Sequence, residues 1–338
     1  MKIAIHHRIN SFSDHWIDYC EKNNIDYKVV NAFDSDIITQ LKDCDAFIWH
    51  HHHGHFKDVL VAKKVLFALE HAGIKVFPNF NTAWHFDDKV AQKYLLEAID
   101  ASLVPSYVFY DKKDAIRWAK KTTYPKVFKL KGGAGATNVK LIKTQKEALK
   151  LIDKAFNKGF AQFDRLNHLK ERYNKYKIGQ DTLLGVAKGA GRLAIPTNFA
   201  KQQPPEKGYI YFQDFIPNDG FDIRVVVING KKAAAEKRFI RENDFRASGS
   251  GKFSYENIDT EVIKESFKIA NQLDLQSVAF DFVIDKNNKP LIIELSYGFG
   301  TQGISNVSGY WDNKLKWYKC KFNPQEWIIE DIIIEITN

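Results

Sequence analysis

Short apolar runs alternate with helical patterns over the first 80 residues of the chain. The runs are rich in β-branched and aromatic residues and predict strands at residues 3–5, 25–31, 45–50 and 74–78. Helix-type spacing of apolar residues falls between them at residues 15–22, 36–41 and 59–72. Strands that alternate with helices are typical of a parallel sheet. We therefore predict a small parallel α/β domain over residues 1–85.

From residue 209 onward, longer β-branched runs carry charged residues inside the predicted strands. These residues are Asp214, Asp222, Arg224, Lys237 and Arg238. Charged side chains seldom line a sheet face unless a ligand, an ion or a partner charge satisfies them. The pattern therefore indicates a functional sheet face.

A second hairpin, at residues 277–298, carries acids where a core strand normally has apolar residues. Because side chains alternate along a strand, Glu294 and Ser296 share one face, and a turn at residues 285–290 can set Asp281 opposite Glu294. Two facing carboxylates repel unless a cation lies between them, and Mg²⁺ binds one or two carboxylates together with water and phosphate oxygens. A solvated face with exposed acids is the alternative.

A glycine-rich turn joins two further predicted strands, residues 126–131 and 139–142. Lys129 and Lys131 are expected on one face of the first strand, and the turn at residues 132–137 exposes backbone N–H groups that can bind phosphate oxygens. The turn matches neither of the two common nucleotide-binding fingerprints. Alone it is equally typical of a flexible hairpin.

In this order the segments resemble the ATP-grasp superfamily, within it the branch of glutathione synthetase and the ligases that add glutamate to a ribosomal protein tail. The matching segments are residues 86–98, 124–139, 212–230, 237–251, 280–285 and 292–298. The resemblance implies an α/β and α+β protein in which two subdomains bind ATP after a smaller N-terminal domain. The expected division is 1–85, 86–208 with a basic insertion at 158–207, and 209–338.

The resemblance also implies roles for individual residues. ATP would be bound by Lys89, Lys129, Lys131, the adenine linker Gln213, Asp214, Phe215 and Ile216, and Asp222 near the ribose. The transferred phosphoryl group and the acceptor carboxylate would face Arg224, Arg238 and Arg246. Asp281 and Glu294 would bind Mg²⁺. Ser296 stands where the family usually has Asn, so the number of metal ions stays open.

The residues at the hairpin of 221–239 allow two pairings. Asn229-Gly230 is typical of a two-residue turn, which would pair Arg224 with Ala235 and leave Lys237 on the face of Arg224. The family motif favours Arg238 instead. A bulge before Lys237 would reconcile the two.

Two other groups are candidates for acceptor binding. His6, His7, His51 and His52 follow predicted strands, and ligands of open α/β sheets bind beyond the carboxyl ends of strands. Zinc binding or a solvated loop are alternatives. A predicted basic helix at residues 160–177 carries Arg165 and Arg172, and a Gly- and Pro-containing loop is expected to follow it at 189–208. An ordinary exposed helix is the alternative.

Composition adds limits to these interpretations. The 338 residues carry a formal net charge of +9, which fits ATP and an acidic acceptor, and show no basic stripe or module typical of nucleic-acid binding. The sequence has no apolar run long enough to span a bilayer and no visible signal peptide. Cys20, Cys44 and Cys320 lack metal spacing and fit a reducing cytoplasm.

These observations lead to one principal hypothesis and two alternatives. The principal hypothesis is an ATP-dependent carboxylate–amine ligase that forms an acyl phosphate, with a uronic-acid-containing saccharide of a bacterial surface polysaccharide as acceptor. The first alternative is a ligase that adds an amino acid to a peptide or protein tail. The second is an ATP-binding regulatory module without ligase chemistry.

Overall fold

The protein consists of two compact units. The computed structural model describes residues 1–132, 138–161, 182–194, 204–241 and 244–337, together with residues 169, 172, 173 and 176. Unit 1 comprises residues 1–86, 95–102 and 217–338, and unit 2 comprises residues 87–94 and 103–216. The N-terminal and C-terminal parts of the chain therefore share one unit, a partition different from the three segments expected from the sequence.

The N-terminal part of unit 1 is a four-stranded parallel sheet in the order β2-β1-β3-β4, as predicted. Its strands are β1 (Lys2–His6), β2 (Asp26–Val30), β3 (Ala46–Trp49) and β4 (Lys75–Phe77), and its helices are α1 (Phe12–Lys22), α2 (Ile37–Gln40), α3 (Phe56–His71) and α4 (Phe80–Ala83). Helix α1 begins three residues before its predicted start because Ser11 caps it, accepting a hydrogen bond from the Ser13 amide.

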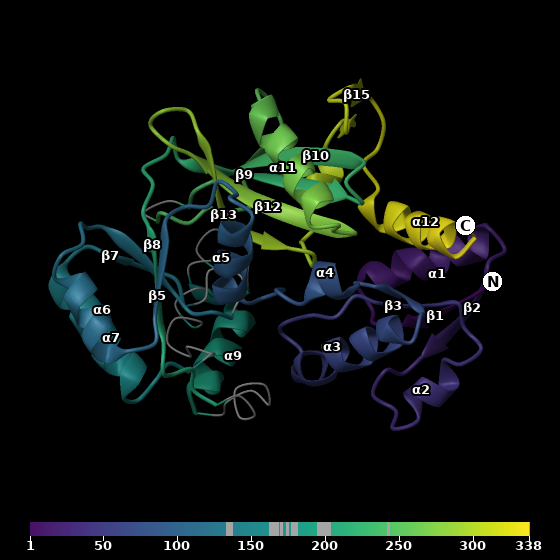
Figure 1. The fold of residues 1–338 in the computed structure, drawn as a ribbon, viewed down its shortest axis with the longest axis horizontal. Helices are drawn as coiled ribbons and strands as arrows, with labels where there is room; N and C mark the ends of the chain where they lie inside the picture. Colours follow the sequence, from purple (N-terminus) through teal and green to yellow (C-terminus); the bar gives the residue numbers. More distant parts are fainter. Residues whose placement is uncertain are drawn as a thin grey trace. The chain divides into compact units, whose positions relative to one another are not determined.

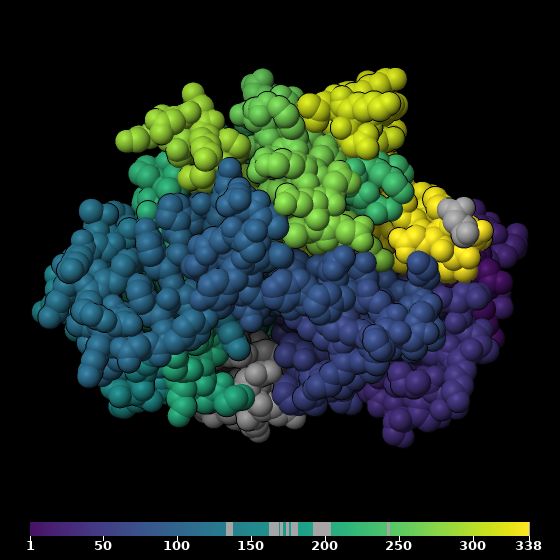
Figure 2. Space-filling model, in the orientation of Figure 1, coloured from purple at the N-terminus to yellow at the C-terminus, as the bar shows by residue number. Residues whose placement is uncertain are grey.

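The C-terminal part of unit 1 is a seven-stranded sheet in the order β13-β12-β9-β10-β14-β15, with β11 paired to β10. Its strands are β9 (Phe221–Ile228), β10 (Lys232–Phe239), β11 (Phe253–Ser254), β12 (Ser277–Ile284), β13 (Pro290–Ser296), β14 (Tyr310–Asp312) and β15 (Trp317–Tyr318). Helix α11 (Thr260–Gln272) packs on β9, β10 and β12 and forms part of the surface seen in Figure 2. The 3₁₀ turn η1 (Ile304–Asn306) lies beside β10.

The two sheets of unit 1 share a hydrophobic core. Val226, Ile228 and Ala279 of the C-terminal sheet join Ile3 and Trp16 in one cluster of buried side chains. Helix α12 (Pro324–Thr337) closes the cluster beside α1 (Figure 1), and the Trp16 indole N–H donates to the Gln325 carbonyl oxygen at 3.1 Å. This core fixes the C-terminal sheet against the N-terminal strands.

The hairpin β9–β10 settles the pairing that the sequence left open. Ile228 pairs with Lys232, so the loop has three residues, 229–231, and Arg224 pairs with Glu236. The two-residue turn and the bulge before Lys237 were therefore wrong. The extra residue lies in the turn, where Asn229 and Gly230 both have positive φ, and it moves every residue of β10 by one position.

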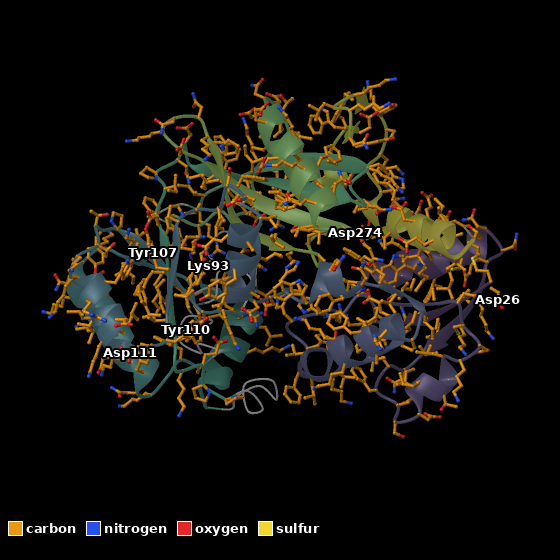
Figure 3. All side chains as sticks on the ribbon, viewed as in Figure 1. Asp26, Lys93, Tyr107, Tyr110, Asp111 and Asp274 are labelled. Carbon is orange, nitrogen blue, oxygen red and sulfur yellow. The ribbon has the colours of Figure 1, made fainter. Side chains whose placement is uncertain are left out.

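Unit 2 is built on a four-stranded antiparallel sheet in the order β5-β8-β6-β7. Its elements are β5 (Ser106–Phe109), β6 (Lys126–Lys129), β7 (Lys140–Ile142), β8 (Ile210–Asp214), α6 (Lys112–Ala119), α7 (Gln145–Phe156), α9 (Leu183–Ala194) and the start of α5 (Lys89–Ala98). Asp111, labelled in Figure 3, caps α6 by accepting from the amides of Lys113 and Asp114.

Two expectations on unit 2 need comment. Residues 189–194, predicted as the start of a loop, form the last turns of α9, because the surrounding Leu, Val and Ala residues favour a helix despite Gly189 and Gly191. The predicted helix at 160–177 lies largely outside the described residues. Among the helices that the structure describes, none is long and apolar enough to cross a bilayer.

Candidate active site

Three neighbouring strands of unit 1 place five charged residues on one sheet face. In the register of the sheet, Arg224 of β9 lies between Asp281 of β12 and Glu236 of β10, and Asp222 pairs with Arg238. Directly paired residues of antiparallel strands project to the same side. The predicted charged face is therefore present, and it contains Arg238, as the family motif favoured.

Asp281 is the centre of this cluster. Arg224 donates to its two oxygens, Nε to Oδ1 at 2.8 Å and Nη2 to Oδ2 at 3.0 Å. Arg238 Nη2 lies 2.8 Å from Oδ2 of the same carboxylate, and Arg238 also binds Asp222 through two hydrogen bonds of 2.6 and 2.7 Å. Burial alone would raise the pKa of Asp281, but the charges of the two arginines outweigh it and hold the pKa well below its usual range.

Glu236 belongs to the same face, and the sequence reading missed it. Its side chain is 2% exposed, and no hydrogen bond from the described residues reaches Oε2. Burial raises the pKa of Glu236 to about 7. Glu236 stands two positions before Arg238, so the pleat would have placed both on one face once Arg238 was preferred.

The acids of the second hairpin meet as predicted. Asp281 pairs with Glu294, and a bulge follows directly, between Asp281 and Phe282. Ser296 lies two residues further along the same face, and its hydroxyl donates to the Gly298 carbonyl oxygen at 3.3 Å. Among the described residues, no group of three or more His, Cys, Asp and Glu side chains is arranged for a metal ion.

The oxygen donors of this hairpin nevertheless fit Mg²⁺ bound together with ATP. Such a site needs only one or two carboxylates, because phosphate and water oxygens complete the octahedron. An ionised carboxylate has about four lone-pair positions, and the arginines occupy three of those of Asp281. The remaining position of Asp281 and the carboxylate of its pairing partner Glu294 would hold the cation, with the Ser296 hydroxyl as a further oxygen.

Two further predicted basic residues make other contacts. Lys237 pairs with Ile223 and lies on the opposite sheet face, where its Nζ is 4.9 Å from the centre of the Phe221 ring. Its grouping with Arg224 was therefore wrong, for the register reason given above. Arg246 binds Asp244 of its own loop, with Nη2 2.6 Å from Oδ2.

Unit 2 holds the residues expected to bind nucleotide except Asp222, which belongs to unit 1 and is bound by Arg238. Lys129 is buried at the end of β6, and its ammonium group donates to the Gln213 Oε1 at 2.7 Å. The Gln213 amide nitrogen donates in turn to the Ser106 hydroxyl at 3.1 Å. Asp214, next along β8, forms an ion pair with the buried Lys126. Phe215 and Ile216 follow directly after β8.

Lys131 differs from Lys129 in a way that the sequence did not predict. Strand β6 ends at Lys129, so Lys131 lies beyond it with an exposed side chain and does not share a strand face with Lys129. Its amide donates to the Tyr209 hydroxyl at 2.7 Å, and its carbonyl accepts from the amide of Lys89 at 2.9 Å. Residues 133–137 of the glycine turn lie outside the described residues.

A cavity of about 720 Å³ lies in unit 1 at the carboxyl ends of β1 and β3. Its lining includes Arg8, His50, His52 and His55 on one side and residues 298–301 on the other. The sequence predicted a binding edge at this place, and the strand ends explain it. His52 lines the cavity, whereas His6, His7 and His51 are not among the lining residues.

His6, His7 and His51 contact neighbouring side chains of unit 1. His6 packs on Phe33 and Trp49, and His51 is buried beside Phe86 and Tyr297. His7 Nδ1 lies 3.1 Å from the Ser13 hydroxyl oxygen. Arg172 lies beside Gly189 of α9, and Arg165 lies outside the described residues.

Comparison with known families agrees with this geometry. Residues 199–314 match the RimK-like ATP-grasp domain, and residues 88–177 match the ATP-binding domain of the carbamoyl-phosphate synthase L chain. A probable alpha-L-glutamate ligase of Marinomonas sp. (strain MWYL1) is 32% identical over 106 residues, 30% of this chain and 35% of the relative. The ribosomal protein bS6–L-glutamate ligase of Escherichia coli O139:H28 is 30% identical over 104 residues, 30% of this chain and 34% of the relative.

Solved structures extend the similarity over nearly the whole chain. A RimK domain ATP-grasp protein from Sphaerobacter thermophilus has a TM-score of 0.58 at 14% identity. The match covers 99% of this chain and 100% of the Sphaerobacter chain. The D-alanine–D-alanine ligase of Bacillus anthracis complexed with ATP has a TM-score of 0.54 at 14% identity. The match covers 89% of this chain and 87% of the ligase chain. The protein thus has the ATP-grasp fold, and residues 199–314 are similar to a RimK-like ATP-grasp domain, in agreement with the resemblance. The chain spans about a third of the length of the curated relatives.

Asp281→Asn is expected to destabilise the protein as well as alter the site. It removes the carboxylate that neutralises Arg224 and Arg238, and breaking a buried ion pair costs about 3–5 kcal/mol. The pKa of Asp281 in the folded state lies below its value of 3.8 in the unfolded state. The ionised carboxylate therefore contributes its full stabilisation above pH 3.8, and this stabilisation is lost as the pH falls through the folded-state pKa. Urea unfolding at pH 7 measures the loss in free energy of unfolding. Glu294→Gln, at a partly exposed residue of the same hairpin, is the comparison. A wild-type free energy of unfolding for Asp281→Asn would contradict the network.

Glu236 should make the stability of the protein fall as the pH rises. Its folded pKa of about 7 exceeds its ordinary value of 4.5, so the folded state holds the proton more tightly between these pH values. The free energy of unfolding should drop by up to about 3 kcal/mol between pH 4.5 and 7 from this group. Glu236→Gln should remove that part of the pH dependence, whereas Glu261→Gln at an exposed position should keep it. Parallel pH profiles of both variants would show that Glu236 is not responsible.

Proposed function

We propose that the protein is an ATP-dependent carboxylate–amine ligase. The observation that carries the proposal is the charged face of β9, β10, β12 and β13, where two arginines and the Asp281–Glu294 pair lie side by side within the RimK-like match. The buried Lys129 and the Gln213 segment of unit 2 support nucleotide binding. The relatives named above as glutamate ligases support the same class of reaction.

The proposed reaction has two steps. An acceptor carboxylate oxygen attacks the γ-phosphorus of ATP, the bond to the β–γ bridging oxygen breaks, and its electron pair leaves with ADP. An amine then attacks the acyl carbon of the acyl phosphate, phosphate departs, and the nitrogen loses a proton to give an amide. Arg224 and Arg238 offset the charge on the transferred phosphoryl group. Bound Mg²⁺ would supply further neutralisation at Asp281, Glu294 and Ser296.

For the substrates we propose an amino acid as one reactant. Two of the relatives are named for L-glutamate, and the D-alanine–D-alanine ligase shares the fold. A uronic-acid-containing saccharide, the acceptor favoured from sequence alone, finds no support among these names. It is kept as one arm of the assay.

A crossed substrate panel tests the proposal. L-Glutamate, D-glucuronate and a peptide ending in glutamate are each combined with ATP, Mg²⁺ and either L-glutamate, L-lysine or ammonia, and ADP and products are measured. ADP release should require an acid and an amine together. Glu294→Gln should lower turnover by at least about 100-fold, because it removes a charge at the reacting phosphates. ATP binding without ADP release in every combination would instead indicate the non-catalytic module.

Lys129→Ala should weaken ATP binding by roughly 10- to 150-fold, since a hydrogen bond to a charged group contributes about 1.5–3 kcal/mol. Calorimetric titration with ATP measures the affinity. Lys140→Ala is the matched control, because Lys140 is an exposed lysine on the neighbouring strand β7. Equal affinities of the two variants would mean that Lys129 has only a structural role beside Gln213.

A further inference from the structure

The cavity at the ends of β1 and β3 contains a histidine whose protonation state can be assigned. The Phe12 amide, at the start of α1, donates to His50 Nδ1 at 3.3 Å. A backbone N–H can only donate, so Nδ1 carries no proton and the single ring proton of the neutral imidazole lies on Nε2. Burial, together with the nearby Arg8, His52 and His53, lowers the pKa of His50 to about 3. His50 is therefore a neutral hydrogen-bond donor.

The Nε2–H group of His50 lacks a partner within the part of the chain that the structure describes. The residue is 9% exposed, and its ring is stacked on Phe12 at 3.8 Å. A Cβ placed on Gly298 would come within 3.7 Å of Nε2, so the glycine places no side-chain atom against this nitrogen. A buried donor without a partner costs about 1–3 kcal/mol, a cost that an oxygen atom of a ligand would remove.

Arg8 supplies a positive charge to the same cavity. It follows β1, and its Nη1 lies 3.3 Å from Oδ2 of Asp58, which is 3% exposed. The same carboxylate oxygen accepts the amide of His52 at 2.8 Å. Asp58 thus holds both Arg8 and the histidine loop in place. A guanidinium has five N–H donors, so one contact with Asp58 leaves others able to bind a carboxylate.

We propose that this cavity binds the acid substrate, with Arg8 holding a carboxylate and the Nε2–H group of His50 donating to a second oxygen atom of the same molecule. The inference rests on the proposed function, because the ligase reaction provides the reason for an acid at this place. The substrate is a carboxylic acid with a further carbonyl, carboxyl or hydroxyl oxygen. Amino acids with acidic side chains and uronic acids both meet this description, and a cavity of about 720 Å³ has room for either.

Direct binding tests the proposal without turnover. L-Glutamate and D-glucuronate are titrated into the protein, and binding is followed by saturation-transfer NMR and calorimetry. His50→Phe keeps an aromatic ring against Phe12 but removes the donor, and it should weaken binding about 2- to 13-fold, the effect of a neutral hydrogen bond. Arg8→Gln should weaken it about 10- to 150-fold. His50→Gln, which retains an N–H donor, should restore part of the affinity.

His85→Phe is the matched control. His85 is buried like His50, but it is not among the residues that line the cavity. This variant should bind the probes as the wild type does. Unfolding curves establish that each variant is folded, and Arg8→Gln, at a partly exposed side chain, keeps the test decisive if His50→Phe does not fold.

The outcomes separate this inference from the ligase proposal. If neither probe binds the wild type, or if Arg8→Gln and His50→Phe bind as tightly as the wild type, the cavity is not the acid site. Normal ADP release by both variants with an unchanged acceptor KM would support the ligase proposal and contradict the assignment of the cavity as the acid-binding site. Probe binding that depends on Arg8 and His50, without ADP release from any acid–amine pair, would support the cavity as the acid-binding site and contradict the ligase proposal.

Discussion

The ion pairs of Asp281 with Arg224 and Arg238 are the constraint on which the reactive face depends. Three strands each contribute one of these charges, and moving a single charge out of water costs several kcal/mol unless its partners lie within hydrogen-bonding distance. A shift of β10 by one residue would carry Arg238 to the other face, leaving Asp222 without its arginine and Asp281 with Arg224 alone. The three-residue loop at 229–231 is thus as necessary to the site as the arginines themselves.

The same strands also form part of the core of unit 1. Along β9, Asp222 and Arg224 belong to the charged end of the sheet face, while Val226 and Ile228 on that face enter the core shared with Ile3 and Trp16. The apolar end fixes the sheet to the N-terminal strands. Because the charged residues lie on the same strand, the packing of the apolar end also fixes their backbone positions. A side chain in such a position needs little further support to keep its geometry.

Strand patterns predicted the parts of the site that depend on alternation, and failed where a loop set the geometry. Asp281 and Glu294 were paired correctly because the pleat fixes which residues can face each other. Lys237 was misplaced and Glu236 was missed because one extra loop residue reverses the faces of β10. The strand ends predicted the edge at which the cavity lies, but which histidines line it depends on the backbone path of residues 50–55, which no periodic pattern encodes. Acceptor binding by these histidines stays a prediction.

Ser296 links the two candidate sites of unit 1. Its hydroxyl donates to the Gly298 carbonyl oxygen, and Gly298 begins the run of residues that forms one wall of the cavity. A serine that donates its only proton in this way still has lone pairs for a cation. The asparagine usual in the family is longer and would place its polar atoms further from the backbone. Serine at this position is therefore consistent with its place in the chain. Ser296 ends strand β13 beside the charged face, and Gly298, two residues later, lies next to His50.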